Sequence, residues 1–81
     1  MRKHYMTLCM YGNTEVTYII NNDKIEVTFE QAVKGGFRDA VFLLDGTVLS
    51  NNGFNNSEID FFRRFTEKNA EVINAEARGE L

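Results

Sequence analysis

Hydrophobic and polar residues alternate along the first 28 positions with the two-residue period of β-strands. The alternation predicts three strands, over residues 4–10, 15–20 and 24–28. Between these segments stand the sequences Gly-Asn and Asn-Asn-Asp, whose residues tolerate left-handed backbone and favour tight turns. We therefore expect the chain to open as an antiparallel meander.

Residues 28–35 carry a helical pattern. Thr28 and Gln31 match a capping box, and the apolar residues around them recur at helical spacing until Gly35-Gly36. The pattern predicts a helix of about two turns, which is stable only when it packs on the sheet.

Residues 40–44 and 47–49 are rich in β-forming residues and flank Asp45-Gly46. This dipeptide is favoured in two-residue type I′ turns, so the segment predicts a hairpin. All five residues of 40–44 are apolar. Such a strand is covered on both faces, so it is expected to be central in the sheet or to lie under a partner.

Residues 57–78 show the spacing of one long amphipathic helix, with Ser57 as the N-cap, Asp60 completing a capping box and Gly79 ending it. The apolar stripe of this helix consists of Phe61, Phe62, Phe65, Val72 and Ile73. At 1.5 Å per residue the helix would be about 33 Å long, which exceeds the length of the strands beneath it. Its second half is therefore expected to project beyond the sheet.

Asn69 lies within the apolar sector of this helix, which leaves two interpretations. In the first, the 4-3-4-3 spacing of positions 58, 62, 65, 69, 72 and 76 forms a short heptad seam in which a buried Asn69 sets the register. In the second, the helix packs on the sheet and its far end is solvated.

Together these elements predict one α+β domain over residues 1–81. It has a mainly antiparallel sheet of four or five strands, one short helix and one long C-terminal helix, in the order β-β-β-α-β-β-α. Seven phenylalanines and a hydrophobic fraction of 43% argue against a disordered chain.

The charge and the hydropathy of the chain argue against several classes of function. The formal net charge is −3 and there is no basic segment, which argues against direct nucleic-acid binding. No apolar run approaches the roughly 20 residues of a membrane span. Residues 1–4 are interpreted as mature sequence and not as a signal peptide. A single cysteine suits a reducing compartment, so the expected location is the cytoplasm.

The chain offers little for catalysis or ligation. His4 and Cys9 would point to opposite faces of one strand, which makes a poor dyad. One Cys and one His do not supply a zinc site, and Gly35-Gly36 would follow a helix where a phosphate loop precedes one. We expect no metal and no cofactor. An enzyme would require a pocket that holds at least two residues of the set Glu26, Glu30, Asp39 and His4.

The second face of the predicted sheet is unusually apolar, because Tyr5, Tyr11 and Ile19 fall on the minority side of their strands together with Cys9. An apolar face of this kind is normally covered. Two helices on opposite sides of the sheet would cover it, and so would a second copy of the chain or another protein.

These observations favour a non-enzymatic protein that binds another protein stoichiometrically, with a homodimer as the expected assembly. The projecting helix and the aromatic residues of the sheet supply the expected partner-binding residues, which are Tyr5, Tyr11, Glu67, Asn69, Glu71 and Glu76. The alternatives are a structural or regulatory homodimer without another partner and a small enzyme with a carboxylate-based site.

The acidic, asparagine-rich and proline-free chain also resembles small products of phages and mobile elements. These include inhibitors of host defence complexes such as anti-CRISPR proteins. The resemblance implies a nucleic-acid-processing complex as the partner, whose basic channel or subunit contact the acidic helix would block.

Overall fold

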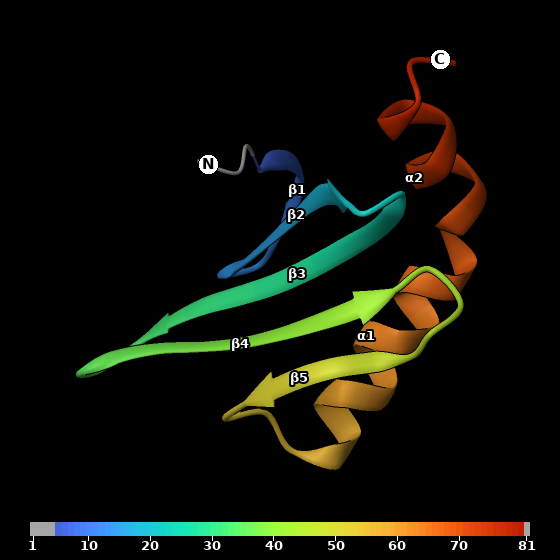
Figure 1. The fold of residues 1–81 in the computed structure, drawn as a ribbon. Helices are drawn as coiled ribbons and strands as arrows, with labels where there is room; N and C mark the ends of the chain where they lie inside the picture. The colour runs from blue at the N-terminus through green and yellow to red at the C-terminus, as the bar shows by residue number, and fades with distance from the viewer. Residues whose placement is uncertain (1–4, 81) are drawn as a thin grey trace.

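The fold is an antiparallel sheet with two helices on one of its faces, as the computed structural model of residues 5–80 shows (Figure 1). The five strands lie side by side in chain order, β1-β2-β3-β4-β5. The elements are β1 Met6–Tyr11, β2 Thr14–Asn21, β3 Lys24–Val33, β4 Gly36–Leu43, β5 Val48–Asn52, α1 Asn56–Lys68 and α2 Ala70–Ala77. The predicted α+β class and antiparallel sheet are confirmed, but both helices follow all five strands.

The short helix predicted over residues 28–35 is wrong, because these residues continue β3 into its hairpin with β4. β3 is hydrogen-bonded to a strand on each side. Against β2 the pairs run from Asn21↔Lys24 to Thr14↔Gln31, and against β4 they extend to Val33↔Gly36. Two ladders outweigh a two-turn helix, whose formation is barely favourable. The two-residue alternation that begins at residue 24 therefore continues through the capping-box motif.

The turns at residues 12–13, 22–23 and 45–46 contain left-handed residues as predicted, but one of them has a different geometry. Asn22 and Asp23 both have positive φ, at 54° and 66°, and join β2 to β3 in a two-residue turn. The hairpin of β4 and β5 is confirmed, but its turn is not type I′, since only Gly46 has positive φ there. Backbone hydrogen bonds from Gly46 to Leu43 and from Leu43 to Thr47 close a longer loop instead.

A β-bulge in β1 changes which face its side chains occupy. Thr7 pairs with Thr17 and Cys9 with Val16, so Leu8 is the extra residue. Leu8 and Cys9 both pack against the core, and Tyr11, which pairs with Thr14, also lies on the helix side. The expectation that Tyr5, Cys9, Tyr11 and Ile19 share one apolar face is therefore wrong.

The single long helix predicted over residues 57–78 is interrupted at Asn69. The side-chain amide of Asn69 donates to the Phe65 carbonyl at 2.8 Å, and its backbone N–H donates to the same oxygen at 3.1 Å. This capping ends α1 at Lys68, and α2 begins at Ala70. The N-cap is Asn55, not Ser57, because the side chains of Asn55 and Glu58 bond each other's backbone N–H groups in a capping box.

The second half of the helical segment does not project from the molecule. Ile73 in α2 is only 2% exposed, Ala77 packs against the core, and α2 contacts β2. Gly79 ends the helix as predicted, with φ at +73° and the paired hydrogen bonds of a Schellman motif.

The core lies between the helices and one face of the sheet, and aromatic rings dominate it. Phe62 of α1 stacks on Phe29 at 4.4 Å between ring centroids and meets Phe54 edge-on at 4.9 Å. Arg38 of β4 lies over the Phe54 ring and pairs with Glu58 at 3.4 Å, which ties the sheet to the start of α1. Both helices lie on this face, so of the alternatives for covering the second face of the sheet, the one with helices on opposite sides does not occur (Figure 1).

Candidate binding surfaces

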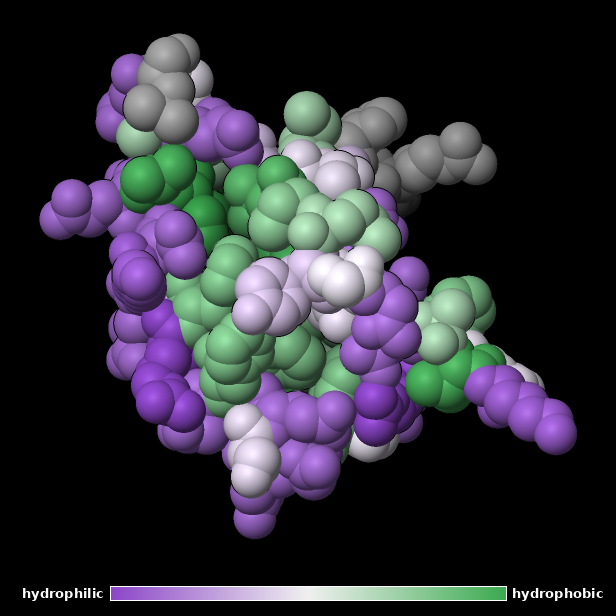
Figure 2. All heavy atoms as spheres, turned by 180° about the vertical axis from the view of Figure 1, so that it is seen from behind, coloured by the Kyte–Doolittle hydropathy of each residue, from purple (hydrophilic) through white to green (hydrophobic). Residues whose placement is uncertain are grey.

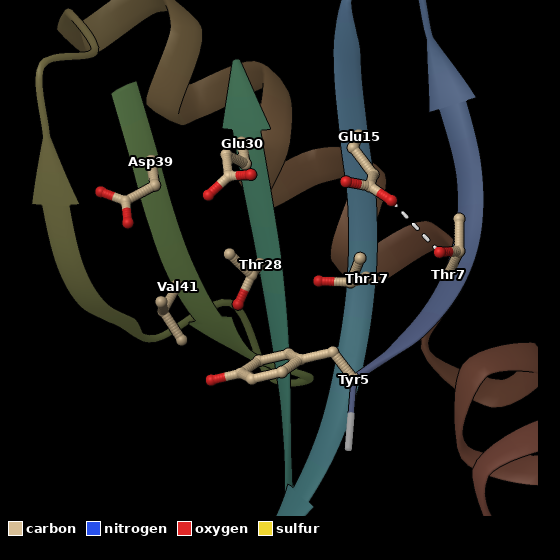
Figure 3. A pocket seen from close by; sticks show the side chains of 8 residues that line it. All are labelled: Tyr5, Thr7, Glu15, Thr17, Thr28, Glu30, Asp39 and Val41. Carbon is tan, nitrogen blue, oxygen red and sulfur yellow. Dashed lines mark hydrogen bonds between the residues drawn. The ribbon is translucent and has the colours of Figure 1, made fainter. Parts of the chain in front are cut away.

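The face of the sheet opposite the helices carries a hollow of about 440 Å³ (Figure 3). Alternate side chains of β2, β3 and β4 point into it because of the pleat of the strands. Its lining residues are Tyr5, Thr7, Glu15, Thr17, Thr28, Glu30, Asp39 and Val41. Tyr5 lies across the lower part of the hollow in Figure 3, with the carboxylates above it.

Three carboxylates form a row across this hollow, which we call the carboxylate row: Glu15, Glu30 and Asp39. The strand register places Glu15 directly opposite Glu30 and Glu30 directly opposite Asp39. Thr7 donates a hydrogen bond to Glu15 at 3.2 Å. The ion pairs found among residues 5–80 join Arg38, Arg63 and Arg64 to acidic residues of α1, and none reaches the row. Like charges placed directly opposite each other destabilise a sheet, so the row gives the open face a negative potential at some expense in stability.

This arrangement meets the geometric condition set for a carboxylate enzyme, since Glu30 and Asp39 line the same hollow. Glu26 lies further along β3, opposite Leu43, and does not line it. His4 lies outside the described residues. Within residues 5–80, no three His, Cys, Asp or Glu side chains are grouped closely enough to hold a metal ion.

A second surface lies between β1 and α1, where apolar side chains form a band bordered by hydrophilic residues (Figure 2). The ring of Tyr11 packs on Phe61 at 5.2 Å, and Phe61 and Phe65 line one shallow depression with the stems of Arg64 and Lys68. Met6, opposite the core residue Tyr18, is on the same side of the sheet. We call Met6, Leu8, Tyr11, Phe61 and Phe65 the apolar strip.

The strip borders the free edge of the sheet. β1 is the terminal strand, and its sequence Met-Thr-Leu-Cys-Met-Tyr contains no charged residue, proline or glycine. β5 forms the other edge with the mostly polar sequence Val-Leu-Ser-Asn-Asn. Charged residues normally protect an edge strand from pairing with another chain. Neither edge strand carries a charged residue, and β1 is the more apolar of the two.

The structure does not gather the six residues predicted to bind a partner on one surface. Tyr5 lines the hollow and Tyr11 belongs to the apolar strip. Glu67 lies beside the β4–β5 turn, where its carboxylate approaches Gly46. Asn69 caps α1, and Glu71 is exposed on α2.

Glu76, also on α2, interacts with the core-facing Tyr18. Burial raises the pKa of the Tyr18 phenol, and the charge and hydrogen bonding of Glu76 raise it further. Glu67, Glu71 and Glu76 are nevertheless all exposed, so they remain candidate acidic contacts for a partner.

Sequence reasoning missed Glu15 as a member of the carboxylate row and missed the exposed strip beside β1. The signal for the row is the set of polar residues at alternate strand positions, which share one face of the sheet: Glu15 and Thr17 on β2, and Thr28 and Glu30 on β3. It was hidden because residues 28–35 were assigned to a helix. The strip depends on the bulge at Leu8, which moves Tyr11 to the helix side.

Comparison with protein-family models, with curated proteins and with solved structures finds no match for this chain. No helix within residues 5–80 combines the length and the apolar character needed to cross a membrane.

Proposed function

We propose that this chain is a non-enzymatic protein-binding module that acts stoichiometrically through the apolar strip. The observation that carries the proposal is the pair of aromatic residues Tyr11 and Phe61, whose rings contact each other at a tilt of 48° while the residues are 55% and 39% exposed beside an uncharged edge strand. Contiguous exposed apolar surface next to unpaired backbone groups is characteristic of sites that another polypeptide covers. Aromatic anchors of this kind contribute most of the binding energy at such sites.

Leu8 and Phe65 form the inner side of the strip and pack against the core, but its exposed aromatic residues lie outside the buried cluster, which supports a binding role. Phe62, one residue after Phe61, is 6% exposed and fills the core with Phe29 and Phe54. Phe61 and Tyr11 lie at the border of that cluster and stay accessible. Their aromatic character is therefore not required to complete the interior.

We further propose that a basic protein surface is the target in the cell, as expected for an inhibitor of a nucleic-acid-processing complex of the anti-CRISPR type. The carboxylate row supports this because it presents three acidic side chains on an open face. Complementary charge would steer a basic partner to this face.

Site-specific photo-crosslinking tests the role of the strip. A photoreactive phenylalanine analogue is placed at Phe61 in one variant and at Phe37, an exposed phenylalanine at the tip of the β3–β4 hairpin, in the matched control. We expect a discrete adduct of fixed stoichiometry from position 61 and none from position 37. Tyr11→Ser should reduce the yield at position 61 by about tenfold, which corresponds to about 1.4 kcal/mol. Equal yields from both positions would refute the proposal.

The second candidate is a carboxylate-dependent hydrolase, favoured by one observation: Glu30 and Asp39 are cross-strand neighbours in one hollow. Paired carboxylates are the usual machinery of glycoside hydrolysis. A panel of chromogenic glycosides tests it with Glu30→Gln, Asp39→Asn and the control Glu26→Gln. Turnover that is lost in the first two variants and kept in the control supports the enzyme, and absence of turnover by the unmodified chain removes it.

A further inference from the structure

We propose that the polypeptide which occupies the apolar strip is a second copy of this chain, joined to the first by antiparallel pairing of their β1 strands. The inference rests on the proposed function and names the partner at the same surface. The pairing would extend the two five-stranded sheets into one continuous sheet, with a two-fold axis between Leu8 and Cys9.

The bulge makes β1 complementary to itself. The pairing with β2 shows which face each side chain of β1 occupies: along the strand, Met6, Leu8, Cys9 and Tyr11 point to the helix face, and Thr7 and Met10 point to the open face. This order reads the same in both directions. Two strands related by a two-fold axis perpendicular to the sheet must place residues of the same face opposite each other.

One register satisfies this requirement along the whole strand. It places Met6 opposite Tyr11 of the second copy, Thr7 opposite Met10, and Leu8 opposite Cys9. A regular strand of six residues lacks this property, because its two ends point to opposite faces. The full overlap of two β1 strands therefore depends on the extra residue at Leu8.

The charge pattern also suits a second copy. β1 brings no charged side chain to the pairing, so the symmetric contact opposes no like charges. The carboxylate row begins on β2 and extends away from β1, so each copy keeps its acidic hollow on the open face.

The surface area that this pairing would bury is sufficient for a specific, weak dimer. Met6, Met10 and Tyr11 are more than half exposed and Phe61 is 39% exposed, so with roughly 200 Å² for each fully exposed side chain they leave about 400 Å² per copy. Two copies and their backbone edges would then bury about 1,000 Å², the lower limit for a specific interface. We therefore expect a dissociation constant on the order of 10 µM.

Sedimentation equilibrium over a range of concentrations tests the dimer, with circular dichroism to check that each variant folds. Met10→Lys places a charge on the open edge, and the matched control Phe37→Lys places the same charge at an equally exposed apolar residue on the hairpin tip. We expect the unmodified chain and Phe37→Lys to dimerise alike. Met10→Lys should weaken dimerisation by at least tenfold.

Disulfide trapping tests the register on a Cys9→Ser background, which removes the only natural thiol. A mixture of the Thr7→Cys chain with the Met10→Cys chain should form mixed dimers, because these positions face each other on the open side. Each chain alone should not, since like positions are three residues apart along the strand.

Three outcomes overturn the inference. The first is a monomer at all concentrations, which would mean that the bulge protects the edge. The second is an equal loss of dimer in Met10→Lys and Phe37→Lys. The third is disulfide formation by the Thr7→Cys or Met10→Cys chain alone to the same extent as by their mixture. A monomer that still gives the Phe61 photo-adduct with another protein leaves the proposed function intact and removes only the dimer. A dimer whose Phe61 adduct contains only the second copy confirms the inference and supports the structural homodimer alternative to the proposed function.

Discussion

Replacement of Phe62 by alanine should remove a large part of the stability of the fold, whereas the same replacement at Phe61 should not. Phe62 is 6% exposed and contacts the rings of Phe29, Phe54 and Phe42. Truncation of a buried phenylalanine costs about 3–5 kcal/mol, including the cavity it leaves. An 81-residue domain has about 4–12 kcal/mol in total, so little stability would remain.

Phe61 provides a matched control because it is the next residue of the same helix. Helix propensity changes equally at the two sites, so the difference reports burial alone. Phe61 is 39% exposed and loses roughly 80 Å² of buried surface on truncation, which corresponds to about 2 kcal/mol. We therefore expect the loss at Phe62 to be about twice that at Phe61.

Urea unfolding followed by circular dichroism measures both values. A protein concentration on the order of 1 µM keeps the chain below the expected dimer range, so that self-association does not add to the Phe61 value. If Phe62→Ala does not fold, Phe62→Leu and Phe61→Leu give the same comparison at smaller amplitude. Equal losses at the two positions would show that α1 presents a different face to the sheet and would refute the packing described above.

Three further predictions concern the turns, the core and the open face. Gly46→Ala should lower the unfolding free energy by about 1 kcal/mol or more in thermal unfolding, because Gly46 has φ at +94° and a Cβ there would lie 2.9 Å from a carboxylate oxygen of α1. Gly12→Ala, with φ at +62° and nothing within 4 Å, should cost less. The raised pKa of Tyr18 means that above about pH 10 the unfolded chain releases this proton more readily than the folded chain, so stability falls as pH rises. Between about pH 9 and about pH 11, the urea concentration at the unfolding midpoint should therefore fall less for Tyr18→Phe than for the unmodified chain. Glu30→Gln should raise the unfolding free energy by about 0.2–1 kcal/mol, since it removes two like-charge contacts; a lower melting temperature for this variant would show that the carboxylate row is stabilised by contacts other than those described.

The candidate surfaces were only partly accessible from the sequence. Glu30 and Asp39 belong to the set of residues from which the sequence predicts that an enzyme pocket would be built, but Glu15 does not, because the register that aligns the three depends on β3 being a strand through residue 33. Tyr11 was expected to be an aromatic anchor, and it lies in the apolar strip. Its neighbour Phe61 was assigned to the core stripe, because helical spacing alone does not separate the centre of a stripe from its border.

The sequence by itself determined the elements whose signals are local. The strict alternation of β2 and the first half of β3, the turn residues at 22 and 23, the hairpin around Gly46 and the helix stop at Gly79 all follow from the conformational preferences of the residues themselves. These preferences act within a few positions along the chain, so a pattern in the sequence is enough to detect them.

Only the tertiary structure decided the features that depend on partners distant in sequence. Residues 28–33 form a strand because β2 and β4 pair with both of their edges, and the bulge at Leu8 exists only relative to β2. The break at Asn69 and the packing of α2 on β2 likewise reflect contacts between separate elements. Cross-strand pairing and burial outweigh local propensities of a few tenths of a kcal/mol per residue, and these long-range contacts decide which face each side chain occupies.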